Sequence, residues 1–205
     1  MAKIRVVAVR HGKKDKPDPS RATTTWALKS RLTEPGIEIA RRVGQQLVEK
    51  LGKNFSVVTS PLVRAQETAF EILMACGIAP EDFDAHMRYD SGLWSGQPSI
   101  WFLSCDPAQY SNAAVYAVLP EAVEQEGQRV LNAIVHAANT AESVGQDVVV
   151  CVSHGGPLDA AIMVARLDLG QEVTIKDLNE GEGAIFTIED GEIVDVEDFL
   201  QAPAV

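Results

Sequence analysis

The fold prediction starts from the segment IRVVAVRHG, residues 4–12. Its first six residues are mostly β-branched and apolar, which predicts a short central strand of a sheet. The strand ends abruptly at Arg10, His11 and Gly12. Ligands of open α/β sheets bind beyond the carboxyl ends of the strands, so these three residues are the first candidates for a functional site.

A second strand ends in the same way, late in the chain. The run DVVVCV, residues 147–152, is almost continuously apolar, which is typical of a parallel strand covered on both faces. It leads directly into Ser153, His154, Gly155 and Gly156. Glycines let backbone N–H groups approach an anion, and a following helix N-terminus favours negative charge. The two histidines, each followed by glycine, therefore indicate an anion site.

Strands and helices alternate along the rest of the chain. Thr33 would cap a helix that Gly52 ends, and Ser60 would cap a helix that runs to about residue 76. The other predicted elements are a strand at 55–58, helices at about 121–142 and 157–168, and a hairpin of 184–189 and 192–196 with its turn at 190–191. This order predicts an α/β fold, a three-layer sandwich whose mostly parallel central sheet has helices on both faces and a C-terminal β-hairpin.

Residues 1–205 are expected to form a single domain with one small insertion. The aromatic segment at about 91–120 has no clear periodicity and predicts a cap, with a short helix near 98–104. The polar segment 13–31 predicts a long loop, and such loops are often functional.

The cysteines and the apolar runs bear on the compartment. Cys76, Cys105 and Cys151 lack metal-ligand or redox spacing, and their odd number fits no disulfide framework, so they are expected to be reduced thiols. The apolar run before Arg10 is too short for a signal peptide, and no run approaches the ~20 residues of a membrane span. We therefore expect a cytoplasmic protein with no membrane partner.

A third segment, TSPLVRAQETA at 59–69, places Arg64 in the first turn of the predicted helix. A cation there opposes the helix dipole, so stability alone does not explain it. Arg64 is better explained if it reaches an anion near the same strand ends. Standing alone, it would be interpreted as an ordinary solvated residue.

Four segments together resemble the histidine phosphatase (phosphoglycerate-mutase-like) superfamily. They occur in the family's order, span most of the chain between residues 4 and 168, and form a highly specific set. The segments are VRHG at 9–12, LTEPGIEIA at 32–40, TSPLVRAQETA at 59–69 and VSHGG at 152–156.

The resemblance implies a metal-independent, cofactor-free phosphatase that forms a phosphohistidine on His11. Arg10 and Arg64 would clamp the phosphoryl oxygens, because their planar forks suit phosphate, and His154 would donate to the same oxygens. Neutral His11 would be the nucleophile, with its tautomer fixed by a hydrogen bond to the other ring nitrogen. The remaining candidate substrate-binding residues are the glycines of the two strand ends and two basic residues of the loop after His11, namely Gly12, Gly155, Lys14 and Arg21.

The proton donor is where the chain departs from the family pattern. A leaving alkoxide needs a proton and the returning water needs a base, and one carboxylic acid can supply both in turn. The mutase-like branch has a Glu four residues before the first glycine of a G-x-W-E-G-like segment, but Arg88 stands at that distance from Gly92. Asp90 is therefore the predicted donor, and a turn-forming role is the alternative.

Two other functions stay open beside the phosphatase. The hypothesis of phosphoglycerate mutase-like phosphoryl transfer has less support, because Lys14 and Pro17 stand where mutases have Ser and Asn. The displaced acid supports a catalytically weakened phosphate-binding protein. A metal site at His11 and His154 lacks a carboxylate or Cys at ligand spacing. The substrate is expected to be a small phosphorylated metabolite or a phosphoprotein, and neither its identity nor the oligomeric state is predicted.

Charge is distributed unevenly along the 205 residues. The formal net charge is −11, which argues against nucleic acid as a partner. Residues 1–64 nevertheless hold 14 basic and five acidic side chains, a net +9. We therefore predict a locally positive pocket mouth on an acidic body, which would admit compact phosphates and disfavour extended polyanions.

Overall fold

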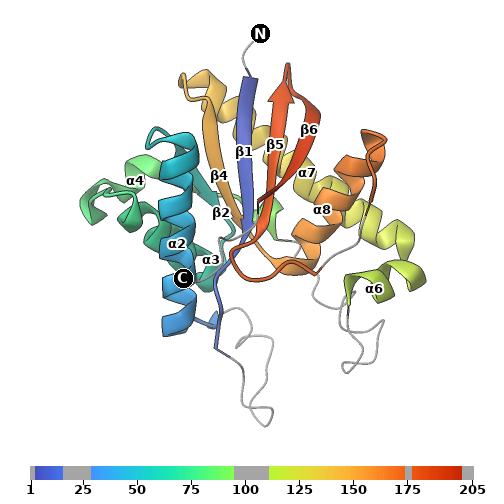
Figure 1. The fold of residues 1–205 in the computed structure, drawn as a ribbon, viewed down its shortest axis with the longest axis horizontal. Helices are drawn as coiled ribbons and strands as arrows, with labels where there is room; N and C mark the ends of the chain where they lie inside the picture. The colour runs from blue at the N-terminus through green and yellow to red at the C-terminus, as the bar shows by residue number, and fades with distance from the viewer. Residues whose placement is uncertain (1–2, 16–28, 95–110, 174–176, 200–205) are drawn as a thin grey trace.

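The computed structural model describes residues 3–15, 29–94, 111–173 and 177–199. Within these ranges six strands form one sheet in the order β3-β2-β4-β1-β5-β6 (Figure 1). The strands are β1 (Lys3–Arg10), β2 (Ser56–Thr59), β3 (Met87–Tyr89), β4 (Val148–Ser153), β5 (Gly183–Glu189) and β6 (Glu192–Phe199). The first four are parallel, whereas β5 and β6 are antiparallel to their neighbours. The predicted mostly parallel sheet is confirmed.

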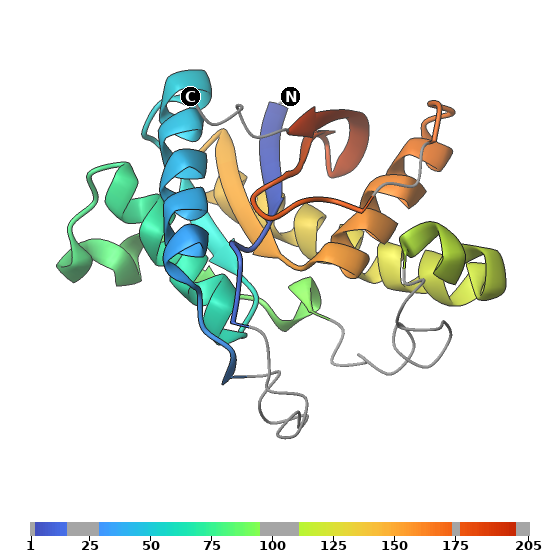
Figure 2. The ribbon, with the colours of Figure 1, turned by 60° about the horizontal axis from the view of Figure 1, so that its bottom comes forward.

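Helices cover both faces of the sheet. On one side lie α2 (Glu34–Leu51) and α3 (Val63–Ala75), and on the other lie α7 (Pro120–Ser143) and α8 (Gly155–Asp168) (Figures 1 and 2). The shorter helices are α4 (Phe83–His86), α6 (Asn112–Val118) and the 3₁₀ turns η2 (Pro80–Asp82) and η3 (Ser91–Leu93). No helix of the described ranges is long and apolar enough to cross a membrane.

Strand β1 lies between two hydrophobic cores. Alternate residues of a strand point to opposite faces of its sheet. Val7 and Val9 accordingly pack in the core with α2 and α3, whereas Val6 and Ala8 pack in the core with α7 and α8. The uninterrupted apolar run of β1 thus reflects burial on both faces.

The carboxyl ends of β1, β2 and β4 meet at one edge of the sheet. Arg10 pairs with Ser153 in the β1–β4 register, and Thr59 pairs with Val152 in the β2–β4 register. The segments that follow these strands are therefore neighbours although they are far apart in sequence.

The predicted start and stop signals hold for α2 and for the hairpin. The Thr33 side chain accepts a hydrogen bond from the Gly36 backbone N–H at 3.2 Å, and Gly52 follows the helix with a positive φ of 81°. Asp190 and Gly191 have φ values of 52° and 80° between β5 and β6. Two positive φ values are what a tight hairpin turn requires.

Two helix boundaries and one strand differ from prediction. Helix α3 begins at Val63, with Leu62 at the N-cap, so Ser60 is not its cap. Helix α8 begins at Gly155, and Gly156 departs from helical geometry with φ 3° and ψ −65°. Strand β3 was not predicted, because a three-residue strand with two exposed side chains leaves no alternation to detect. The short helix predicted near 98–104 lies outside the described residues.

Candidate active site

Backbone hydrogen bonds hold three sequence motifs together at the carboxyl edge of the sheet. The His11 N–H donates to the Ser153 carbonyl at 3.0 Å, and the Ser60 N–H donates to the Val152 carbonyl at 3.0 Å. The Arg10 N–H donates to the Glu182 carbonyl at 2.8 Å, so a fourth segment joins them. The loops after β1, β2 and β4 therefore share one site with the segment before β5.

The His11 ring is held in one tautomer. Its Nδ1 lies 2.6 Å from the Gly12 carbonyl oxygen, which can only accept a hydrogen bond, so Nδ1 carries the proton. Its Nε2 lies 3.0 Å from Nε of Arg64 and accepts that N–H. Burial, and then the Arg64 charge, lower the pKa of His11 well below 6.5. The neutral imidazole thus presents a lone pair on Nε2, as a nucleophile requires.

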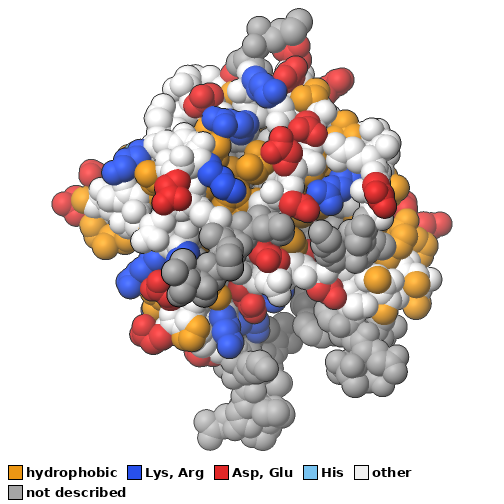
Figure 3. All heavy atoms as spheres, in the orientation of Figure 1, with side chains coloured by type: hydrophobic (Ala, Val, Ile, Leu, Met, Phe, Trp, Pro, Cys, Tyr) orange, Lys and Arg blue, Asp and Glu red, His pale blue; other side chains and the backbone are white. Residues whose placement is uncertain are grey.

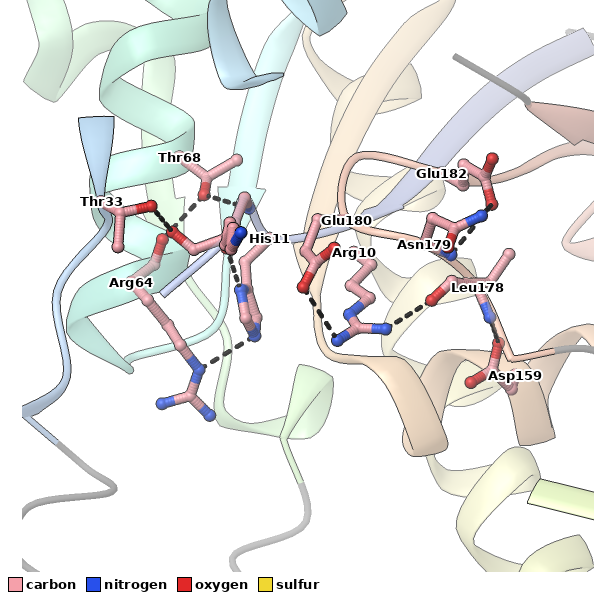
Figure 4. Close-up of polar contacts among 12 residues, drawn as sticks. Arg10, His11, Thr33, Arg64, Thr68, Asp159, Leu178, Asn179, Glu180 and Glu182 are labelled. Carbon is pink, nitrogen blue, oxygen red and sulfur yellow. Dashed lines mark hydrogen bonds and ion pairs between the residues drawn. The ribbon is translucent and has the colours of Figure 1, made fainter. Parts of the chain in front are cut away.

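Close backbone packing explains why glycine follows His11. A Cβ on Gly12 would lie 2.4 Å from the Gly36 carbonyl oxygen at the start of α2. The Gly12 N–H donates to the Thr68 hydroxyl at 3.0 Å, and that hydroxyl donates to the Arg64 carbonyl at 2.8 Å (Figure 4). Helices α2 and α3 therefore fix the backbone that orients His11.

Arg64 points from the first turn of α3 into the site. It is only 8% exposed, and burial followed by the Arg10 charge lowers its pKa to about 10. Besides its contact with His11, its Nη1 donates to the Ser30 hydroxyl at 3.4 Å. Stability alone does not explain a cation in this position, whereas an incoming anion would offset its cost.

His154 lies beside His11, with ring centroids 5.1 Å apart in an edge-on arrangement. Its Nε2 is 2.7 Å from the Ser60 hydroxyl, which also accepts the Leu62 N–H. When that hydroxyl donates to Nε2, the ring proton is on Nδ1. Nδ1 is buried and has no hydrogen-bond partner in the part of the chain that the structure describes. A buried N–H without a partner suits a bound anion.

Arg10 reaches the segment before β5. Its Nη1 donates to the Leu178 carbonyl, and its Nη2 lies 3.5 Å from the Glu180 carboxylate (Figure 4). Its Nε is buried without a hydrogen-bond partner among the described residues. Gly155 lies beside this side chain, and a Cβ there would meet the Arg10 guanidinium carbon at 3.4 Å, an ordinary contact distance.

Ser60 and Asp159 are among the residues of this network that sequence reasoning did not single out. Asp159 is buried on α8, and its carboxylate accepts the Leu178 N–H at 3.1 Å and the Asn112 side-chain N–H at 2.5 Å. Burial raises its pKa to about 7, against the opposing effect of the Leu178 hydrogen bond and the Arg10 charge. A lone acid inside the apolar run of α8 was the available signal. For Ser60 the neighbouring Pro61 favoured a helix cap instead.

The structure brings Lys14 toward the site but gives Asp90 a turn geometry. Burial, then the charges of Arg64 and Arg10, lower the pKa of Lys14. The Asp90 carboxylate accepts the Gly92 N–H at 2.6 Å at the start of η3, and its backbone N–H donates to Thr59. Asp90 as a proton donor stays a prediction. Arg21 lies outside the described residues.

The cations gather locally rather than over a broad surface. Arg64, Arg10 and Lys14 all lower the pKa of His11, which shows that their positive charge acts at that ring. Figure 3 shows acidic and basic side chains intermixed on the face in view. In the described ranges, the side chains that could ligate a metal do not gather into a group of three or more.

Comparisons with known proteins give a match to one family profile. The sequence profile of the histidine phosphatase superfamily (branch 1) matches residues 6–180. A comparison with curated protein sequences finds no match.

Among solved structures, a phosphoglycerate mutase from Bacillus anthracis str. Sterne is similar, with a TM-score of 0.64 at 18% identity over 97% of this chain and 93% of that one. Mycobacterial glucosyl-3-phosphoglycerate phosphatase has a TM-score of 0.55 at 18% identity, over 96% of this chain and 97% of that one. A mutant phosphoserine phosphatase from Entamoeba histolytica, in complex with phosphoserine, has a TM-score of 0.51 at 20% identity, over 96% of both chains. At these identities the likeness shows the fold.

Proposed function

This chain belongs to the histidine phosphatase superfamily, and we propose that it hydrolyses a phosphomonoester or a phosphoprotein through a phosphohistidine on His11, without a metal. One observation carries the proposal above all. A buried, neutral imidazole accepts the Arg64 Nε–H on its Nε2 lone pair, and two further buried nitrogens, Arg10 Nε and His154 Nδ1, have no hydrogen-bond partner in the described structure. Such a set would bind an anion and attack it.

In the first step, a substrate phosphoryl group binds to Arg64, to Nε of Arg10 and to Nδ1 of His154. The His11 Nε2 lone pair forms a bond to phosphorus while the ester P–O bond breaks. The leaving oxygen takes a proton, for which Asp90 is the predicted donor, and departs as the alcohol. Preorganised donors stabilise the charge on the transferring phosphoryl oxygens, which is the largest part of catalysis in phosphoryl transfer. In the second step, water loses a proton to a carboxylate base and its oxygen bonds to phosphorus from the side that the alcohol has left. The bond between phosphorus and Nε2 of His11 breaks, its electron pair returns to Nε2, and phosphate is released.

A phosphatase is proposed in preference to a mutase because of the segment after His11. Lys14 and Pro17 replace the Ser and Asn of the mutase pattern. The substrate is proposed to be a small phosphorylated metabolite or a phosphoprotein in the cytoplasm, with no nucleic acid partner. The mutase alternative would be recognised by isomerisation of a phosphosugar or phosphoglycerate.

The test is hydrolysis of an aryl phosphate in the presence of a chelator, by the wild type and by His11→Ala. The wild type should turn over, the variant should not, and vanadate should inhibit because it mimics five-coordinate phosphorus. Equal turnover by the variant would refute the proposal. Phosphate binding without turnover of any ester or acyl phosphate would instead identify a phosphate-binding protein.

A further inference from the structure

Glu180 is a carboxylate that the fold fixes beside Arg10. The Gly181 N–H donates to the Arg10 carbonyl at 2.9 Å, and the Arg10 N–H donates to the Glu182 carbonyl at 2.8 Å. The segment that carries Glu180 is therefore bound at both sides to the end of β1. The Glu180 side chain turns toward the Arg10 guanidinium, 3.5 Å away, as Figure 4 shows.

Other carboxylates near this edge are engaged by neighbouring groups. Asp159 is buried and accepts hydrogen bonds from the Leu178 backbone N–H and the Asn112 side chain. Asp90 accepts one from the Gly92 N–H. Glu182 accepts two hydrogen bonds from Asn179. The Glu180 side chain is 34% exposed, so water can reach a carboxylate that also contacts Arg10, a proposed phosphoryl ligand.

Hydrolysis of a phosphohistidine requires a base. The attacking water must lose a proton as its oxygen bonds to phosphorus, and a positioned carboxylate can accept that proton. An ion pair with a guanidinium favours the ionised carboxylate, which is the form that accepts. The base must also stand at the phosphoryl group, and Glu180 contacts Arg10, which is a proposed ligand of that group.

We propose that Glu180 is the general base of the dephosphorylation step. Water donates a proton to the Glu180 carboxylate, its oxygen bonds to phosphorus, and the bond between phosphorus and Nε2 of His11 breaks. The electron pair of that bond returns to Nε2, and the products are phosphate and a carboxyl group that releases its proton to solvent. This proposal deepens the proposed function and rests on it.

The experiment separates the two steps with an aryl phosphate, whose weakly basic leaving group departs without a proton donor. Glu180→Gln keeps an oxygen that can accept from Arg10 but removes the base. Stopped-flow measurement should show a burst of aryl alcohol equal to the enzyme concentration, followed by turnover at least about 100-fold slower than in the wild type. Glu180→Asp, which retains a carboxylate, should recover part of the rate.

Glu182→Gln is the matched control, because it lies on the same segment, keeps an acceptor for Asn179 and should leave turnover within about threefold of the wild type. The proposal is overturned if Glu180→Gln turns over within about threefold of the wild type. It is also overturned if turnover slows without a burst, because the first step has then become limiting, or if Asp90→Asn shows the burst instead. If the wild type never phosphorylates His11, the proposed function itself is refuted. That outcome is measured on the wild type, whereas the role of Glu180 is tested on the Glu180→Gln variant.

Discussion

Asp159→Asn should change how stability depends on pH. The Asp159 carboxyl has a pKa raised from 3.8 to about 7 in the folded protein, first of all by burial. Between pH 4 and 7 the folded state therefore binds more protons at this group than the unfolded state does. Stability consequently falls as pH rises through this window, because ionisation of the buried carboxyl is unfavourable.

The magnitude follows from the two pKa values. A pKa rise from 3.8 to about 7 corresponds to about 4 kcal/mol of lost stability over the whole window. Of this, about 3 kcal/mol falls between pH 5 and pH 8. Asparagine is neutral at every pH, so the variant does not lose this stability as pH rises. The unfolding free energy of the variant relative to the wild type should therefore rise by up to about 3 kcal/mol from pH 5 to pH 8.

The assay is urea unfolding of both proteins at pH 5 and pH 8. The difference in unfolding free energy between variant and wild type isolates this carboxyl, because other titrating groups cancel. Asp168→Asn, which removes an exposed carboxylate from the same helix, is the control for the substitution itself. The reasoning fails if the difference between Asp159→Asn and the wild type is the same at both pH values.

Three further predictions concern the site. Arg64→Lys should lower kcat/KM by about 10²–10³-fold, because lysine lacks both the planar fork of arginine and the Nε–H that donates to His11. A change under threefold would contradict this role. Gly12→Ala should lower stability by about 1–3 kcal/mol, since its Cβ would meet the Gly36 carbonyl at 2.4 Å, and an unchanged Tm would argue against that clash. Burial and Arg64 hold the pKa of His11 well below 6.5, so protonation of the nucleophile should abolish kcat/KM only below pH 6.5. An acid limb with its midpoint at or above 6.5 would be inconsistent with the buried, neutral ring.

Patterns with a strong periodicity or a local cap were sufficient to predict most of the fold. The apolar runs that became β1 and β4, the helix between Thr33 and Gly52, and the Asp190–Gly191 turn each have a local physical cause. Strand β3 has no such cause, because its place at the sheet edge depends on pairing with β2. The start of α3 was predicted wrongly since Ser60 is a good cap by type, yet its hydroxyl contacts His154 across 94 residues of sequence.

The site was predictable to the extent that motifs mark strand ends. Arg10, His11, Arg64 and His154 were chosen from their positions, and the structure brings them together. Contacts from the segment 177–182 were not predictable, because that segment has no periodicity and reaches Arg10 only through the β1–β5 pairing. The sequence therefore indicated the cations that lie near His11 but gave no reason to single out Glu180.

The most direct test is to locate the phosphoryl group on the enzyme. Glu180→Gln, quenched during turnover of an aryl phosphate and digested, should carry phosphate on the peptide that contains His11, at Nε2. The double variant with His11→Ala should carry none. Phosphate on another residue, or turnover that continues without His11, would contradict a phosphohistidine mechanism.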